Sequence, residues 1–153
     1  MISRLTVVAA LVALGAPLSG ATSDPANPRT VGITAGDNMK YSVTEIVARR
    51  GERLRIVLTS TGTMPKMAMA HNVVVLAKGT DANAFIDAST LARDDGFIAQ
   101  TFMKNVLAAT QLAGNGETVE ASFDAPKTAG RYDFVCSVPG HYLAGMRGVL
   151  VVN

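Results

Sequence analysis

The sequence is poor in several residue types, and each scarcity excludes a way of building or using the protein. Its 153 residues include one cysteine, two histidines and no tryptophan. With a single cysteine the chain cannot close an internal disulfide, which small secreted domains commonly use. Charge is also scarce, because 14 basic and 12 acidic residues leave a net charge of only +2. A field this weak, without a basic cluster, argues against nucleic acid as a partner.

Long apolar runs are also missing, because the main apolar run, near the start of the chain, is short. Leu5–Leu14 follows Arg4, and small residues lead up to Ala21. This order is typical of a secretory signal peptide. The run of about ten residues is half of the roughly 20 that a membrane-spanning helix needs. We therefore expect residues 1–21 to be a cleaved signal peptide and residues 22–153 to form one periplasmic domain without a membrane span.

Most of the remaining chain alternates between apolar and polar residues, which is the pattern of half-buried β-strands. Arg53–Ser60 and Glu117–Phe123 show it most clearly. The other expected strands cover Thr30–Thr34, Met39–Ala48, Ala70–Leu76, Phe102–Leu112, Tyr132–Cys136 and Arg147–Asn153. Residues 78–96 suit a short helix, and Leu107–Ala109 would also fit a helix. The pattern predicts an all-β fold, an antiparallel Greek-key β-sandwich of about eight strands with a short helical insertion.

The residues with distinctive chemistry gather near the C-terminal end. Cys136, His141 and Met146 are separated by four residues at each step, so one loop between two strands can aim all three at a single point. The other histidine, His71, must come from a different strand. One thiolate, two imidazoles and a thioether form the ligand set of a blue copper site. Each residue alone has an ordinary explanation in a protein core, but together they predict copper.

Two neighbouring features agree with a metal-binding loop. Pro139 and Gly140 lie between Cys136 and His141 and shape the loop. Asn72 follows the upstream histidine, so its side chain could tie the two ligand segments together by hydrogen bonds. Contacts of this kind orient metal ligands and tune a metal's reduction potential.

These segments resemble the azurin and plastocyanin family of cupredoxins. The resemblance is carried by Pro65–Lys66, Met69–Asn72, Cys136–His141 and Met146–Gly148, and it extends from about Val31 to Asn153. It implies one type 1 copper ion, with His71, Cys136 and His141 as equatorial ligands and Met146 as the axial ligand. It also implies that electrons pass through the exposed edge of His141.

The sequence departs from azurin in three respects. Azurins carry a disulfide near the N-terminus, which a chain with one cysteine cannot form. Ala70 precedes the first histidine, where azurins usually have a glycine whose carbonyl lies near copper. The interval from His141 to Met146 is one residue longer than in azurin and resembles auracyanins. We therefore interpret the chain as azurin-like or auracyanin-like.

The resemblance implies a one-electron carrier that cycles between Cu(I) and Cu(II). We expect a monomer whose partners are redox proteins, such as c-type cytochromes or a periplasmic reductase or oxidase. Uncharged residues flank His141, so we expect a small apolar docking patch around its edge. The residues expected there are Met64, Met67, Val138, Pro139, Tyr142, Leu143 and Ala144.

Two other functions remain open from the sequence. A copper chaperone or store could use Met64, Met67 and Met69 as soft ligands for Cu(I), although these residues would equally form an apolar rim. An enzyme could use Cys136 and His141 as a nucleophile pair. That activity would leave the other two candidate ligands without a role, and a copper oxidase or nitrite reductase needs further histidines. We therefore expect no enzymatic activity.

Overall fold

The computed structural model describes residues 27–153. The predicted signal peptide, residues 1–21, lies outside the described residues and stays a prediction. Within the described part, no helix combines the length and the apolar character that crossing a membrane requires.

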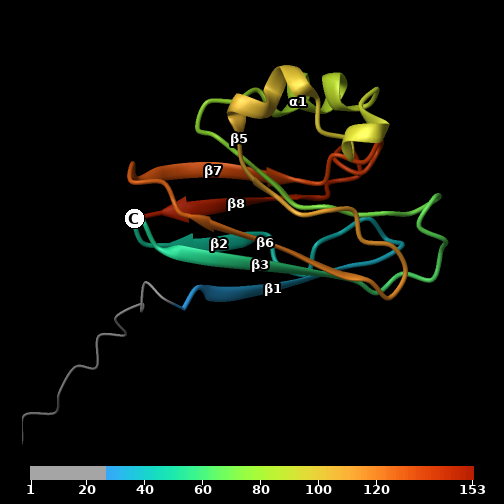
Figure 1. Ribbon diagram of the computed structural model, residues 1–153, viewed down its shortest axis with the longest axis horizontal. Coiled ribbons are helices and arrows are strands. Elements are labelled where there is room, and N and C mark those ends of the chain that lie inside the picture. Colours follow the sequence, from blue (N-terminus) through green and yellow to red (C-terminus); the bar gives the residue numbers. More distant parts are fainter. Residues whose placement is uncertain (1–26) are drawn as a thin grey trace, which may run out of the picture.

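The domain is a sandwich of two β-sheets (Figure 1). One sheet has three strands in the order β1-β3-β6, and the other has five in the order β2-β8-β7-β4-β5. The strands of the first are β1 (Arg29–Ala35), β3 (Arg53–Ser60) and β6 (Thr118–Asp124). Those of the second are β2 (Glu45–Ala48), β4 (Val74–Leu76), β5 (Val106–Ala109), β7 (Gly130–Val135) and β8 (Arg147–Val152). The expected all-β sandwich of eight strands is confirmed.

We expected antiparallel strands, but two of the described strand pairs are parallel. β1 runs parallel to β3, and β2 runs parallel to β8, whereas the other pairs are antiparallel. The chain turns at residues 36–38 after β1 and then crosses to the opposite sheet, where β2 forms an edge strand. Alternation along a strand is the same for either direction, so the sequence pattern could not distinguish parallel pairing here.

The core between the sheets follows the predicted alternation. In β3, Leu54, Ile56 and Leu58 are buried. Tyr132 and Phe134 of β7 are buried in the same cluster. Removing this apolar surface from water is the main favourable term in folding. The sandwich therefore has a core that is independent of any metal.

The outward-facing side of the three-stranded sheet is charged. Arg53 and Arg55 alternate with the buried residues of β3 and form ion pairs across to β6, at 3.1 Å from Asp124 and 3.7 Å from Glu120. These exposed pairs contribute at most about 1 kcal/mol each. Arg53 and Arg55 thus belong to a solvated strand face.

Three expected strands are shorter in the structure. Of Met39–Ala48, only β2 is a strand. Met39 has a positive φ of 53°, which lies outside the range of an extended backbone, so a strand cannot begin there. Of Ala70–Leu76, only β4 is a strand. Of Phe102–Leu112, only β5 is a strand, and it is preceded by the 3₁₀ helix η2 (Gln100–Asn105). The helical alternative at Leu107–Ala109 is wrong, because these residues belong to β5, and the 3₁₀ helix before them was not predicted.

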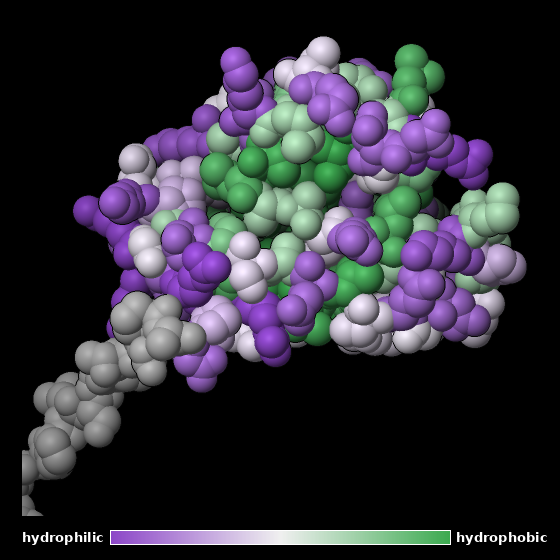
Figure 2. Space-filling view, in the orientation of Figure 1, coloured by the Kyte–Doolittle hydropathy of each residue, from purple (hydrophilic) through white to green (hydrophobic). Residues whose placement is uncertain are grey.

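The helical insertion is confirmed as α1 (Ala82–Ser89), followed by the 3₁₀ helix η1 (Arg93–Asp95). Asp81 caps α1 by accepting hydrogen bonds from two backbone N–H groups of its first turn. Phe85 and Ile86 pack in a second apolar cluster with strands β4 and β7. In Figure 1 this segment lies over the five-stranded sheet, and Figure 2 shows apolar residues gathered beneath it. The insertion thus covers the outer face of that sheet.

Candidate metal centre

The structure brings three of the predicted ligands together. His71, Cys136 and His141 each offer one ligand atom, and these atoms all lie within 4.8 Å of one another. The Nδ1 atoms of the two histidines are 3.3 Å apart, and the Cys136 Sγ is 3.4 Å from the His141 Nδ1. All three residues are buried, with His141 the most exposed at 4%. Residues 65 positions apart in the sequence therefore share one enclosed centre.

His71 reaches this centre from outside any regular strand. Its backbone forms an isolated bridge with Ala113, with N–H···O distances of 2.9 Å and 2.8 Å in the two directions. Two residues later, the Val73 N–H donates to the side chain of Thr110 at 3.0 Å, and β4 begins only at Val74. A pair of backbone hydrogen bonds, rather than a strand ladder, thus positions this histidine.

The other candidate ligands belong to the loop between β7 and β8, which lies at the end of the sandwich opposite the C-terminus (Figure 1). Its ends are joined by a bond from the Cys136 N–H to the Met146 carbonyl, at 3.1 Å. The Met146 N–H donates a hydrogen bond to the His141 carbonyl at 2.9 Å. Gly140 and Gly145 have φ values of +84° and +92°, which residues with a Cβ rarely adopt. The loop is a tight, cross-linked turn that holds its side chains in place.

Met146 is fully buried and packs in the main core cluster. Its backbone bonds place it directly beside both other ligand residues of the loop. Its proposed role as the axial ligand stays a prediction, because burial and packing would be the same for a methionine that serves only the core.

Asn72 ties the two ligand segments together, as expected. Its Oδ1 accepts from the Ser137 N–H at 2.9 Å, and its Nδ2 donates to the Ser137 Oγ at 2.8 Å. Since Asn72 follows His71 and Ser137 follows Cys136, this pair of bonds sets the spacing between the upstream ligand and the loop. Asn72 also donates to the Gly96 carbonyl at 3.2 Å, which anchors the helical insertion.

Burial decides the protonation of the centre. It raises the pKa of the Cys136 thiol to about 11, although backbone N–H groups of Asn72 and Val138 act in the opposite direction. It lowers the pKa of His141 to about 4, with a smaller contribution from the neighbouring His71. The pKa of His71 is also lowered by burial, against an opposing effect of Asp37. At neutral pH without metal, the centre therefore holds a thiol and two neutral imidazoles.

Several supporting residues were not identified from the sequence. The ammonium of Lys40 donates to the Ala144 carbonyl of the ligand loop. Asp37 accepts from the Thr63 backbone and hydroxyl at 2.8 Å and 2.9 Å, and these bonds lower its pKa. The buried hydroxyl of Tyr41 donates to the Asn72 carbonyl. A buried tyrosine usually finds a partner for its hydroxyl, but the sequence does not say which partner.

The donor set and its spacing fit copper. Two imidazoles and a thiolate suit a soft or borderline metal ion rather than magnesium or calcium. Nitrogen and sulfur atoms about 2.0–2.3 Å from a tetrahedral first-row ion, such as zinc, are about 3.3–3.6 Å from each other. The observed separations of 3.3 Å and 3.4 Å agree with this spacing. One ion can thus be held by the three side chains with little rearrangement.

Cu(I) uptake by the metal-free protein at pH 7 is expected to release about one proton per ion. The pKa of Cys136, about 11, lies above pH 7, so the thiol must lose its proton to bind. Both histidine pKa values are lowered from 6.5, so the imidazoles have none to lose. Calorimetry in buffers of different ionisation enthalpy measures the number of protons released for each ion bound. Uptake without proton release would contradict the thiol's role.

Comparisons with known proteins agree with this site. Residues 29–153 match the copper-binding proteins of the plastocyanin/azurin family. Azurin-2 of Alcaligenes xylosoxydans xylosoxydans is 36% identical over 128 residues, which are 77% of this chain and 92% of that protein. Outer membrane protein H.8 of Neisseria meningitidis serogroup B is 34% identical over 111 residues, or 71% of this chain. The match spans only 60% of the H.8 protein's own length.

A solved structure is similar as well. Auracyanin A, a "blue" copper protein from Chloroflexus aurantiacus, superimposes with a TM-score of 0.72 at 31% identity, covering 83% of this chain and all of that chain. A β-sandwich that buries two imidazoles and a thiol at one end defines the cupredoxin class. Within that class, the chain belongs to the plastocyanin/azurin family of copper-binding proteins. Copper is the cofactor of this family, and the three buried side chains form the group that can hold it.

Proposed function

We propose that the protein is a periplasmic one-electron carrier with a single type 1 copper site, held by His71, Cys136, His141 and Met146. The convergence of two imidazole nitrogens and one sulfur in a buried centre carries the proposal. When bound, copper would supply a one-electron couple between Cu(I) and Cu(II). The chain's own part is to hold the donors at fixed spacing and to exclude water.

The rigidity of the site suits electron transfer. The loop is closed by backbone bonds at Cys136 and Met146, and the Asn72 side chain fixes its distance from the upstream histidine. Since these bonds involve no ligand atom, they persist in both oxidation states. The donors therefore need little movement when an electron arrives or leaves. A rigid centre of this kind keeps the reorganisation energy of electron transfer low.

The direct test is the visible spectrum of the copper-loaded protein, together with voltammetry. A carrier gives an intense thiolate-to-copper charge-transfer band in the oxidised form and a reversible one-electron couple. A colourless Cu(II) complex, or a couple that does not return on reoxidation, would overturn the proposal.

We propose no enzymatic role, because all three candidate donors are buried together, where a substrate has no access to them. The donor atoms of Cys136 and His141 face each other and the buried His71. Within the described residues, both histidines of the chain are in this one cluster. The groups needed for a second copper centre are therefore missing from the described part.

The docking patch proposed around His141 is smaller than the sequence predicted. Leu143 is 83% exposed and Met67 is 87% exposed, with Met64 also on the surface. Tyr142 and Val138 are buried, which corrects their placement on the patch. Tyr142 packs toward the helical insertion, with the Arg147 guanidinium 5.0 Å from its ring centre. Leu143 and Pro139, which is exposed as well, are thus apolar groups that the ligand loop offers to a partner.

Leu143→Glu is expected to slow electron self-exchange and exchange with a c-type cytochrome by on the order of tenfold, equivalent to about 1.4 kcal/mol. The carboxylate would enter an apolar contact from which water is excluded, while the ligands stay unchanged. Val47→Glu is the matched control, because Val47 is 51% exposed and lies in β2, at the far end of β8 from the ligand loop. Stopped-flow kinetics measures both variants. Equal rates in the two would place the electron exit on another face.

A copper chaperone or store is the second candidate, and exposed methionines favour it. Met67 and Met64 present thioethers to solvent a few residues before the upstream histidine. The buried, cross-linked donor set favours a carrier instead, because such a site exchanges metal slowly. Competition for Cu(I) with a strong chelator decides between them. Rapid release that is slowed by replacing both methionines with leucine would favour the chaperone.

A periplasmic location is proposed from the order of charged, apolar and small residues before Ala21. N-terminal sequencing of the protein from a periplasmic extract tests it. A mature chain that begins at Thr22 would agree, whereas a chain that retains the first 21 residues would not.

A further inference from the structure

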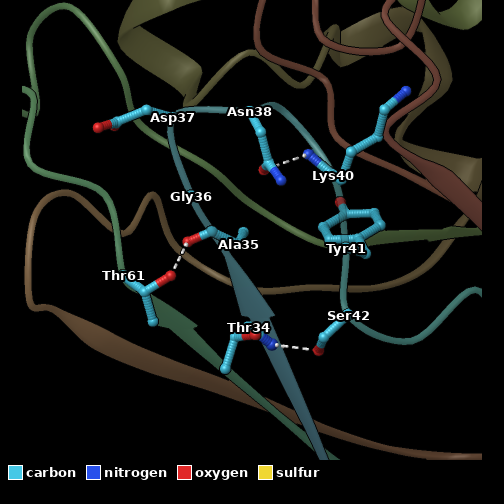
Figure 3. A pocket seen from close by; sticks show the side chains of 9 residues that line it. All are labelled: Thr34, Ala35, Gly36, Asp37, Asn38, Lys40, Tyr41, Ser42 and Thr61. Carbon is cyan, nitrogen blue, oxygen red and sulfur yellow. Dashed lines mark hydrogen bonds between the residues drawn. The ribbon is translucent and has the colours of Figure 1, made fainter.

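Tyr41 lies close to the metal centre and supports it, although it is not one of the predicted copper ligands. It lies on the loop after β1, between Lys40 and Ser42 (Figure 3). An isolated bridge to Ala35 holds its backbone, and its ring packs 5.7 Å from that of Phe134. Only 6% of the residue is exposed, so the ring cannot turn out into solvent without breaking these contacts.

The Tyr41 hydroxyl acts at the junction of the two ligand segments. It donates a hydrogen bond to the backbone carbonyl of Asn72, the residue after His71. Asn72 in turn binds Ser137, the residue after Cys136, through both atoms of its side-chain amide. One buried hydroxyl thus fixes the residue on which the spacing of the whole centre depends.

The Tyr41 hydroxyl acts as a donor at this position. Burial raises the pKa of Tyr41 well above its usual value, so the hydroxyl keeps its proton at neutral pH. A tyrosine hydroxyl has one proton to donate, and here that proton is used in the bond to the Asn72 carbonyl.

We propose that Tyr41 is a positioning residue whose hydroxyl, by bonding the Asn72 carbonyl, holds the two ligand segments at the spacing that sets the reduction potential of the copper centre. The inference rests on the proposed carrier function. Without this bond Asn72 is held less firmly between His71 and Ser137, and contacts that orient metal ligands tune the potential of such a centre.

The test compares Tyr41→Phe with Tyr132→Phe in the copper-loaded protein. Tyr132 is the matched control, because it is also buried in the main core cluster and its hydroxyl donates to a backbone carbonyl, that of Thr128, at 2.7 Å. Tyr41→Phe is expected to shift the reduction potential and the charge-transfer band, because the spacing of the ligand segments loses one of its supports. Tyr132→Phe is expected to lose stability but to keep the wild-type potential and band.

The outcomes separate the two proposals. A wild-type protein without the intense band or a reversible couple overturns the carrier function, and the inference falls with it. A normal wild-type protein whose Tyr41→Phe variant keeps the same potential and band overturns the inference alone.

If Tyr41→Phe does not fold, NMR of the reduced wild-type protein replaces it. The Tyr41 hydroxyl proton is then expected to exchange slowly with solvent and to show close contacts with residues 72 and 73, on either side of the carbonyl that it bonds. Fast exchange, or no such contacts, would overturn the inference.

Discussion

Cys136→Ser is expected to abolish the intense visible absorption of the copper-loaded protein. The band originates on the thiolate, and Cys136 is the only cysteine of the chain. A serine hydroxyl is a far weaker and harder donor, so copper affinity also falls. Because Cys136 is buried inside a core that does not depend on metal, the metal-free variant is expected to fold. Absorption spectroscopy measures the loss, and circular dichroism checks the fold.

Ser137→Ala is the control for this experiment. Ser137 is equally buried and adjacent, but its hydroxyl oxygen accepts a hydrogen bond from the Asn72 side chain and takes no part in the candidate ligand set. The variant is expected to keep the intense band, with a shift that reflects the looser link between the ligand segments. A band that survives in Cys136→Ser would remove the thiolate from the site.

Gly148→Ala is expected to lower the free energy of unfolding by about 1–3 kcal/mol, the usual cost of overfilling a packed core. A Cβ at this position of β8 would lie 2.2 Å from the ring of Phe134 and 2.6 Å from the backbone carbonyl of Thr44. Phe134 is buried against Tyr41, and the Thr44 carbonyl accepts from Val149, so neither can move without breaking other contacts. Denaturant titration of the metal-free protein measures the change.

Gly32→Ala provides the comparison. Gly32 also lies in a strand, β1, but a Cβ there would meet nothing within 4 Å. The alanine is expected to be neutral or to stabilise the protein by up to about 1 kcal/mol, because glycine loses more backbone freedom on folding. Similar losses in both variants would mean that strand propensity, and not close packing at Gly148, sets the effect.

Strand positions could be predicted wherever one face of a strand is buried and the other is solvated. Arg53–Ser60 meets this condition over its whole length, and its predicted bounds match β3. The predicted strands were too long where a local feature of the backbone interrupts the hydrogen bonding between strands. At Met39 that feature is a positive φ, and near His71 it is a bridge to Ala113. Neither local feature appears in the alternation of apolar and polar residues.

The sequence by itself determined which chemical groups are available at the centre. One thiol, two imidazoles and a nearby thioether are so scarce in this chain that their spacing already indicated copper. The tertiary structure decided how three of them meet, because the distance between the Nδ1 atoms of residues 71 and 141 depends on the backbone bridge at His71 and on the loop between β7 and β8. It also decided that Tyr41 and Lys40 support the site, since both act on backbone carbonyls, which every residue carries and no sequence pattern marks.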